Sequence, residues 1–303
     1  MSSRPPYKYH TSDLYSAHLP AGFVDLRGNG DRKAAAAAHY ADVSEIIPPT
    51  SPPVGAWDRF AWESTDNRWA GATFTAARDM LRDGWIEGAD RAAAIRGRIE
   101  ADRPAAQKLI RWDVAGAYPS VGRFLSGNPA NMRRLGQANT PRVLSLSVDG
   151  ALSASVSAAD MEAHAASAAA IIDTLEAADY RVELFWVWRA NGDSLRTEVA
   201  ACVKQADQAV NLSTLAFSLG HPAMLRRIGF ALVGSIPHWR GISTTMGVPC
   251  PLVADPERGA YVIPSAQTTK AGSDPIKAFD AQITALRKQG CPGLSDEPDA
   301  QAA

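Results

Sequence analysis

The stretch Arg142-Val-Leu-Ser-Leu-Ser-Val-Asp149-Gly-Ala-Leu-Ser153 decides the fold of this chain. An apolar run rich in β-forming residues ends at the acidic Asp149, and a helix-forming segment and a second apolar run follow it. This order of strand, acidic tip, helix and strand is typical of an α/β domain, whose ligands lie at the tips of its parallel strands. The stretch therefore predicts both a fold class and the place of a site.

The segments that follow this stretch extend the same pattern. Apolar positions at helical spacing predict a helix over residues 158–177, and Ser157 with Asp160 resembles a capping box at its start. Asp274 and Pro275 predict the start of a last helix. Apolar runs and alternation predict three more strands, at residues 181–188, 195–203 and 261–263. The strand at 195–203 is expected to be antiparallel and to lie at a sheet edge, because a short polar turn leads into it.

The remaining segments have different compositions. Six large aromatic side chains between residues 57 and 85 predict a compact, mostly helical region. The alanine run Ala34–Ala38 predicts a short helix within an otherwise irregular segment. A strand, a turn and a short helix at Val121–Leu125 are expected before the α/β domain. The predicted divisions are an irregular segment 1–55, a helical region 56–140, an α/β domain 141–291 and a disordered tail 292–303.

The composition excludes several classes of protein. The chain has 303 residues, 46% of them hydrophobic and 21% charged, as in an ordinary globular protein. Its net charge of −1 argues against a general polyanion-binding surface. The three cysteines form no Cys-x-x-Cys pair, which disfavours a zinc ribbon or a disulfide framework and suits the reducing cytoplasm of a bacterial host cell. No apolar run is long enough to predict a membrane span, and the first residues do not resemble a signal peptide.

The common catalytic motifs do not occur in the sequence. Neither of the two glycine-rich phosphate-binding patterns is found, and neither is a Gly-x-Ser-x-Gly elbow or a His-Glu-x-x-His motif. These absences lower the odds of an NTPase, a dinucleotide enzyme, an α/β hydrolase or a zinc hydrolase. A binding protein is therefore favoured over an enzyme.

The order of elements in residues 141–291 looks like a von Willebrand factor A-like, Rossmann-like domain. The metal site of that family reads Asp-x-Ser-x-Ser at the tip of the first strand. Here the tip reads Asp149-Gly-Ala151-Leu-Ser153, with an alanine in place of the first serine. The resemblance implies a degenerate site for Mg²⁺ or Mn²⁺ at Asp149 and Ser153, since hard cations take oxygen ligands. The alternative is that Asp149 only caps a turn or the following helix.

Two later loops would complete such a site. The resemblance implies a hydroxyl or amide ligand from a second loop, here one of Asn211, Ser213 or Thr214. Where the family often has an aspartate in a third loop, this chain has Ser265 and Gln267. We expect Ser213 and Thr214 as the second-loop ligands, without a basis for choosing between them.

Two pairs of arginines are candidates for binding a partner or a phosphate group. One pair is Arg133 and Arg134, and the other, Arg226 and Arg227, follows His221 in a probable helix start. The alternative for the second pair is a proline in the first helical turn followed by two solvated cations.

The chain as a whole is similar to proteins encoded in tailed-phage and related mobile genomes. The passages that carry this similarity are Trp69-Ala-Gly-Ala, Asp83-Gly-Trp-Ile-Glu-Gly88, Asp113-Val-Ala-Gly-Ala-Tyr-Pro119, Leu125-Ser-Gly-Asn-Pro-Ala-Asn-Met132 and His221-Pro-Ala-Met-Leu-Arg-Arg227. The similarity implies a genomic context and no reaction.

Together these patterns predict a protein-binding or assembly module of a phage or mobile element, with a degenerate divalent-cation site and a protein partner. Two alternatives stay open. One is a metal-dependent hydrolase or nuclease, which needs a second carboxylate near Asp149. The other is a nucleic-acid-binding accessory protein that uses the arginine pairs.

Overall fold

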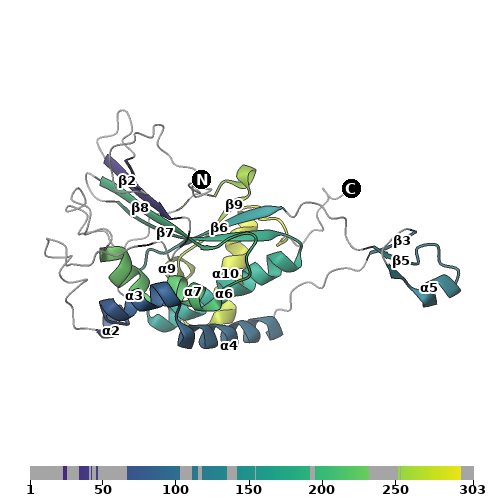
Figure 1. Cartoon of the computed structure of the whole chain (residues 1–303), viewed down its shortest axis with the longest axis horizontal. Coiled ribbons are helices and arrows are strands. Elements are labelled where there is room, and N and C mark those ends of the chain that lie inside the picture. Colours follow the sequence, from purple (N-terminus) through teal and green to yellow (C-terminus); the bar gives the residue numbers. More distant parts are fainter. Residues whose placement is uncertain are drawn as a thin grey trace.

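Figure 1 shows a computed structural model of the chain. The structure describes residues 23–25, 34–40, 42, 46, 67–102, 111–114, 118–134, 142–153, 155–191, 195–231, 252 and 254–294. Most of the predicted irregular segment 1–55 and of the predicted tail 292–303 lies outside the described residues. So do Cys250 and several of the N-terminal aromatic residues.

A mixed sheet of six strands forms the centre of the fold, in the order β1-β2-β8-β7-β6-β9. The strands are β1 (Phe23–Asp25), β2 (Ala34–Tyr40), β6 (Val143–Asp149), β7 (Arg181–Asn191), β8 (Leu195–Lys204) and β9 (Ala260–Ile263). β6 lies between β7 and β9 and is parallel to both, whereas β8 is antiparallel to β7. The mixed α/β fold class and the four strands predicted after residue 141 are confirmed.

The alanine run is the clearest departure from the sequence-based expectation. The predicted helix at Ala34–Ala38 is wrong, because β2 pairs in parallel with β8 along the register from Ala34 opposite Leu195 to Tyr40 opposite Ala201. Helix propensity is a weak preference per residue, and here β8 on one side and β1 on the other supply hydrogen-bond partners for the backbone of β2. It follows that β8 is not an edge strand, since β2 covers it.

The described part of the chain has four helices of ten residues or more. They are α3 (Phe74–Asp83), α4 (Ile86–Asp102), α6 (Ala158–Ala177) and α10 (Pro275–Lys288). Of these, α6 and α10 contact the sheet, and α3 and α4 pack against other helices. The predicted capping box of Ser157 and Asp160 is confirmed at the start of α6, and the Asp274 side chain caps α10. Gly84 ends α3 with a φ of 84°, as its position after the apolar run predicts. None of the described helices is both long and apolar enough to cross a membrane.

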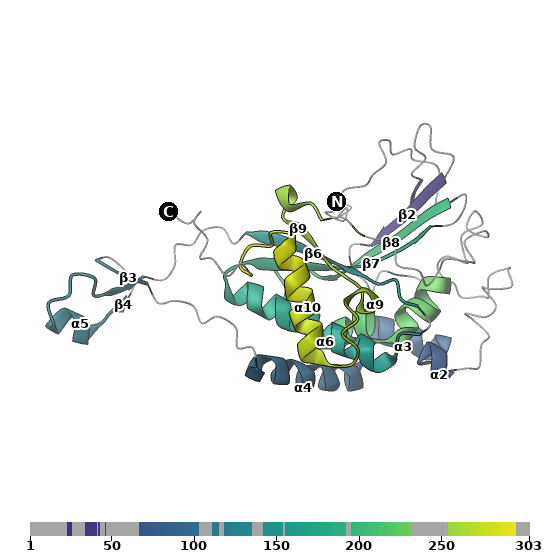
Figure 2. The same ribbon diagram turned by 180° about the vertical axis from the view of Figure 1, so that it is seen from behind.

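The two faces of the sheet have different neighbours. Leu144, Leu146 and Val148 of β6 join a hydrophobic core with α6, so Asp149 points toward the opposite face. α6 packs against both α4 and α10. Figures 1 and 2 show these three helices on the same side of the sheet.

The helices of residues 67–102 share the core of the sheet. Leu81, Trp85 and Ile99 belong to the same buried cluster as Leu146 and Ile172. The region predicted as mostly helical thus contributes α3 and α4 to the core of the α/β domain. We call the six-stranded sheet and the helices that share its core the body.

A second, smaller sheet stands apart from the body. It consists of β3 (Arg111–Asp113), β4 (Tyr118–Pro119) and β5 (Met132–Arg134) in the order β3-β5-β4, together with the short helix α5 (Val121–Leu125). This confirms the predicted strand and short helix. Among the described elements, its strands pack extensively only on one another. Figures 1 and 2 show it beyond the end of α4, and we call residues 111–134 the arm.

At the β9 edge of the large sheet, a side chain and a loop take the hydrogen bonds that a further strand would make. The Gln289 side chain accepts a hydrogen bond from the N–H of Val262 at 2.7 Å and donates one to its carbonyl at 2.8 Å. The next outward-facing residue, Ala260, exchanges both backbone hydrogen bonds with Asp255. Both outward-facing residues are therefore satisfied, which protects the sheet from pairing with another strand at this edge.

We expect Gln289→Ala to lower the free energy of unfolding by about 1–3 kcal/mol, because it leaves two backbone groups of Val262 without their partner. Chemical denaturation of the wild type and the variant measures the change. Gln289→Glu is the matched control, since a carboxylate can still accept the N–H of Val262 and should cost less. Equal stability of Gln289→Ala and the wild type would contradict the role assigned to this side chain.

Candidate functional site

The tip of β6 is a tight turn that begins at Asp149. The Oδ1 atom of Asp149 accepts the N–H of Ala151 at 3.0 Å, and the N–H of Gly150 donates to the carbonyl of Val187 at 2.6 Å. A side chain at Gly150 would overlap the indole of Trp186, so this position needs a glycine. Asp149 therefore caps its own turn, as the structural alternative in the sequence predicts.

The loop that follows, residues 150–157, is held by two other parts of the body. We call it the tip loop. The N–H of Ser153 donates to Oε1 of Gln267 at 2.9 Å, which joins it to α9 (Ala266–Thr269), the short helix after β9. The Nη2 atom of Arg226 donates to the carbonyls of Ser153 and Val156, each at 3.1 Å. Ser153 and Gln267, predicted from two separate loops, are thus brought together.

The residues predicted for the second loop lie elsewhere. Asn211 caps α7 (Leu212–Leu215) by accepting the N–H groups of Ser213 and Thr214. Its oxygen also accepts the Ser213 hydroxyl at 2.8 Å, and a side chain at Gly84 would overlap that hydroxyl. α7 follows the end of β8 at Lys204, which pairs with Leu184 near the start of β7, whereas Asp149 pairs with Val187 further along. The structure does not bring Ser213 and Thr214 to the pocket at the tip of β6.

These positions do not fit the predicted Mg²⁺ or Mn²⁺. Ala151 is buried where the resembling family has a serine, and one oxygen of Asp149 is engaged in the turn. Among the residues that the structure describes, no three or more His, Cys, Asp or Glu side chains form a group that could hold a metal ion. The protein atoms at the tip therefore serve the turn and do not form a ligand set.

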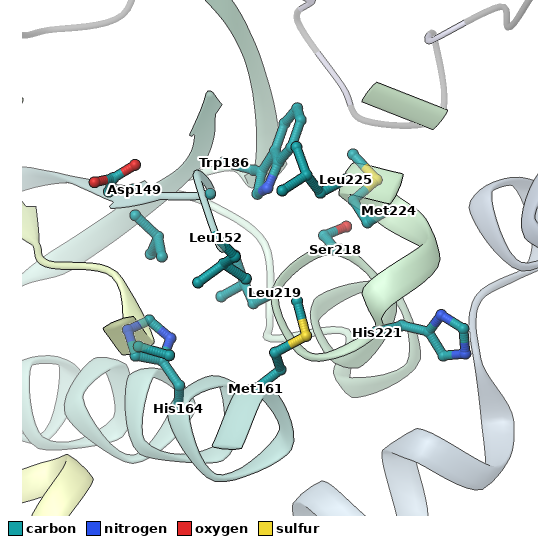
Figure 3. Close-up of a pocket in the computed structure, with 13 residues that line it drawn as sticks. Asp149, Leu152, Met161, His164, Trp186, Ser218, Leu219, His221, Met224 and Leu225 are labelled. Atoms are coloured by element: carbon teal, nitrogen blue, oxygen red, sulfur yellow. The ribbon is translucent and has the colours of Figure 1, made fainter. Parts of the chain in front are cut away.

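Figure 3 shows a pocket next to the tip of β6. It lies between Leu152 of the tip loop, Met161 and His164 of α6, and Ser218 and Leu225 of the segment after α7. The Asp149 carboxylate points away from the apolar side chains at its centre. The pocket has room for about one water molecule. It is too small for a cofactor or an organic substrate.

Two π-helical segments line this pocket. They are η2 (Ala216–Gly220) and η3 (Met224–Gly229), and His221 and Pro222 lie between them. The wider turn of a π-helix shifts which side chains share a face, and such segments occur frequently at functional sites. Here Ser218 of η2 and His221 after it line the pocket. Arg226 and Arg227 of η3 are buried in the body.

His221 is a buried neutral group. Its Nδ1 atom accepts the N–H of Ala223 at 3.1 Å, and its ring meets Trp85 edge-on at 4.5 Å between centroids. Burial, and to a smaller extent Arg91, lowers the pKa of His221 to about 4. Burial also lowers the pKa of His164, whose Nε2 atom lies 2.7 Å from the carbonyl of Pro264. Both imidazoles are therefore uncharged near neutral pH, and the predicted binding of a phosphate by His221 has no charge to support it.

Arg226 and Arg227 are buried as well, at 4% and 0% exposure. Arg226 reaches the carbonyl of Trp69 with Nη1 at 2.6 Å, in addition to the two carbonyls of the tip loop. The Nε atom of Arg227 donates to the carbonyl of Ala72 at 3.0 Å. The expectation of two solvated cations is wrong for this pair, because backbone carbonyls take the place of water around each guanidinium. The signal in the sequence is the apolar Ile228-Gly-Phe-Ala-Leu run that follows them.

The other predicted pair lies in the arm. Arg133 and Arg134 belong to β5, where they are opposite Trp112 and Arg111 of β3. Their side chains lie outside the described part of the structure. Their backbone positions place them in the arm and away from the pocket.

The buried thiols offer no nucleophile. Burial raises the pKa of Cys202 to about 12 and that of Cys291 to about 12. Since the thiolate is the reactive form, both side chains are inert near neutral pH.

Comparison with known proteins places the chain in a family. The model of a family described as a domain of unknown function, DUF7192, matches residues 31–290. No curated protein and no solved structure matches the chain.

The buried His221 predicts a loss of stability in acid. Its folded pKa of about 4 lies below the ordinary value of about 6.5, so the unfolded chain binds the proton at the higher pH. The contribution to stability is complete above about pH 6.5 and falls by up to about 3 kcal/mol as the pH drops toward 4. Urea unfolding at about pH 7 and about pH 4.5 should show a smaller loss in His221→Gln, which keeps an acceptor for the Ala223 N–H. An equal loss in the two proteins would contradict the assignment.

Proposed function

We propose that this chain, which belongs to the DUF7192 family, is a protein-binding and assembly module that engages its partner through the arm. The observation that carries the proposal is the distribution of exposed apolar side chains. In the described part of the chain six large hydrophobic residues are exposed, and four of them lie in the arm, namely Val114, Val121, Phe124 and Leu125. Leu125 is 78% exposed and Phe124 66%.

The size of the arm supports this proposal. It has 24 residues, and chains shorter than about 40 residues rarely bury enough apolar surface to be stable alone. A three-stranded sheet gains stability when its apolar face packs against another surface. Exposed apolar residues that cluster in one place are typical of an interaction site. A partner protein would supply the surface that the arm lacks.

The body would act as the scaffold of this module. We propose that it is von Willebrand factor A-like, and the supporting observations are β6 between two parallel neighbours, the antiparallel β8 and the acidic residue at the tip of β6. A metal ion is not part of the proposal, because the residues at the tip do not fit one. The phage or mobile-element context stays a prediction.

No observation favours the metal-dependent hydrolase or nuclease. That reading needs a second carboxylate near Asp149 and a metal ion, and the described residues hold no group of three or more His, Cys, Asp or Glu side chains that could bind one. The small pocket also leaves no space for a substrate.

Nucleic-acid binding is the second candidate, and one observation favours it. In the arm, Arg111 pairs with Arg134 and Trp112 with Arg133, so basic and aromatic residues are neighbours on adjacent strands. Cations and stacking rings are the groups that hold single strands. The apolar residues of α5 are not explained by this reading, so we rank it second.

Photo-crosslinking tests the proposal. With p-benzoylphenylalanine in place of Phe124, we expect discrete protein adducts when the chain is irradiated in an extract of the cells that make it, because this ring would lie at the interface. The same group in place of Val143, which is 50% exposed on the body, is the control and should give no such adducts.

Two outcomes would overturn the proposal. An adduct at position 124 that disappears after nuclease treatment would favour nucleic acid over protein. The absence of any adduct at 124, with a folded chain, would mean that this surface has no partner.

A further inference from the structure

We infer that the surface bound by the arm is the body of a second copy of this chain. This inference rests on the proposed function and names its partner. It follows from the charge of the arm, from one exposed corner of the body and from the direction in which the arm points.

The charges of the arm and of the remaining chain are opposite. Residues 111–134 contain four arginines and one aspartate, which gives a formal charge of +3. Since the whole chain carries −1, the remaining residues carry −4. Complementary charge steers two surfaces together and disfavours contact between like surfaces. The arm therefore suits the remainder of this same chain better than it suits another arm.

The corner between α3 and α4 offers an exposed apolar residue beside two exposed acidic residues, with Arg82 paired to Asp83 on one side and Arg91 over the ring of Trp85 on the other. Ile86 begins α4 and is 62% exposed, and it lies directly after the buried Trp85. Glu87 and Asp90 are exposed beside it and have no ion-pair partner in the described part of the chain. An exposed apolar residue beside acidic side chains matches α5, where Arg123 stands next to Phe124. We call residues 83–90 the corner.

The geometry favours a second copy over the chain's own corner. α4 has 17 residues, so Ile86 at its start lies about 24 Å from Asp102 at its end. The arm follows that far end, and Figures 1 and 2 show it pointing away from the body there. An arm so placed reaches the corner of a neighbouring molecule. Reciprocal exchange between two copies would give a closed dimer with two identical arm–corner contacts.

Two sets of substitutions test the two sides of this contact one at a time. Phe124→Ser with Leu125→Ser removes the apolar face of the arm, and Ile86→Ser with Asp90→Arg removes the corner. All four side chains are exposed, so the fold should be retained, and the urea unfolding midpoint of each variant checks this. Val143→Thr is the matched control, since it changes an exposed apolar residue of the body outside both surfaces.

Size-exclusion chromatography with light scattering measures the association. We expect the wild type to reach twice the chain mass of 32.3 kDa as its concentration rises. Each set of substitutions should raise the dimer dissociation constant at least about tenfold, and the control should leave it unchanged. A mixture of the arm variant and the corner variant should recover a mixed dimer at high concentration, because one arm–corner contact is intact in it.

Three results would overturn the inference. They are a wild type that stays monomeric at every concentration, variants that dimerise as well as the wild type, and a mixture that fails to associate although the wild type does. If the wild type is monomeric but position 124 crosslinks to another protein, the inference fails and the proposed function stands. If position 124 crosslinks to nothing, both fail.

Discussion

The buried guanidinium of Arg226 holds together parts of the chain that are far apart in sequence. It donates to the carbonyls of Trp69, Ser153 and Val156, and it stacks over the ring of Trp69 at 5.2 Å. Burying a charge is costly unless its donors are satisfied, and burial accordingly lowers the pKa of this arginine. Backbone carbonyls of Trp69 and of the tip loop offset part of that cost by accepting from Nη1 and Nη2, whereas Nε is buried without a partner among the described residues. Together with Gln267, this side chain holds the tip loop in its place beside the pocket.

This constraint explains why the body does not present an open site at the tip of β6. A ligand site at this place needs side chains that are free to turn toward a ligand, as in other sheets of this class. Here Asp149 is engaged in its own turn, Ser153 is bound to Gln267, and the π-helical segments fill the space above them. In the proposed function, the body therefore serves as the support of the arm. Among the residues whose side chains the structure describes, most of the exposed large apolar ones lie in the arm.

Much of the body could be predicted from the sequence because its signals are local. The strand that ends at Asp149, the capping box of α6 and the start of α10 at Asp274 each depend on neighbouring residues, and each is found as expected. The strand β2 could not be predicted, because pairing with β8 decides its conformation and alanine itself favours a helix. A contact between segments far apart in the sequence leaves no pattern among neighbouring residues from which it could be predicted.

The candidate site was predicted less well for the same reason. Ser153 and Gln267 do meet, as neighbouring strand tips require. Ser213 and Thr214 do not reach them. Both residues lie in α7, and the chain enters the pocket only in the next segment, η2. Arg226 and Arg227 are charged, and their charge alone predicts that they lie exposed on the surface. The apolar run after them is a local signal of burial, but the carbonyl partners that make this burial possible lie far away in sequence.

Amide hydrogen exchange on the wild type and on Arg226→Met tests most directly whether a rigid body is held by this arginine. The account predicts slow exchange of the amides in residues 150–156 of the wild type and fast exchange in the variant, with the arm unchanged between the two proteins. If these amides exchange as fast in the wild type as in Arg226→Met, the tip loop is not held by Arg226 and the account of the body is wrong.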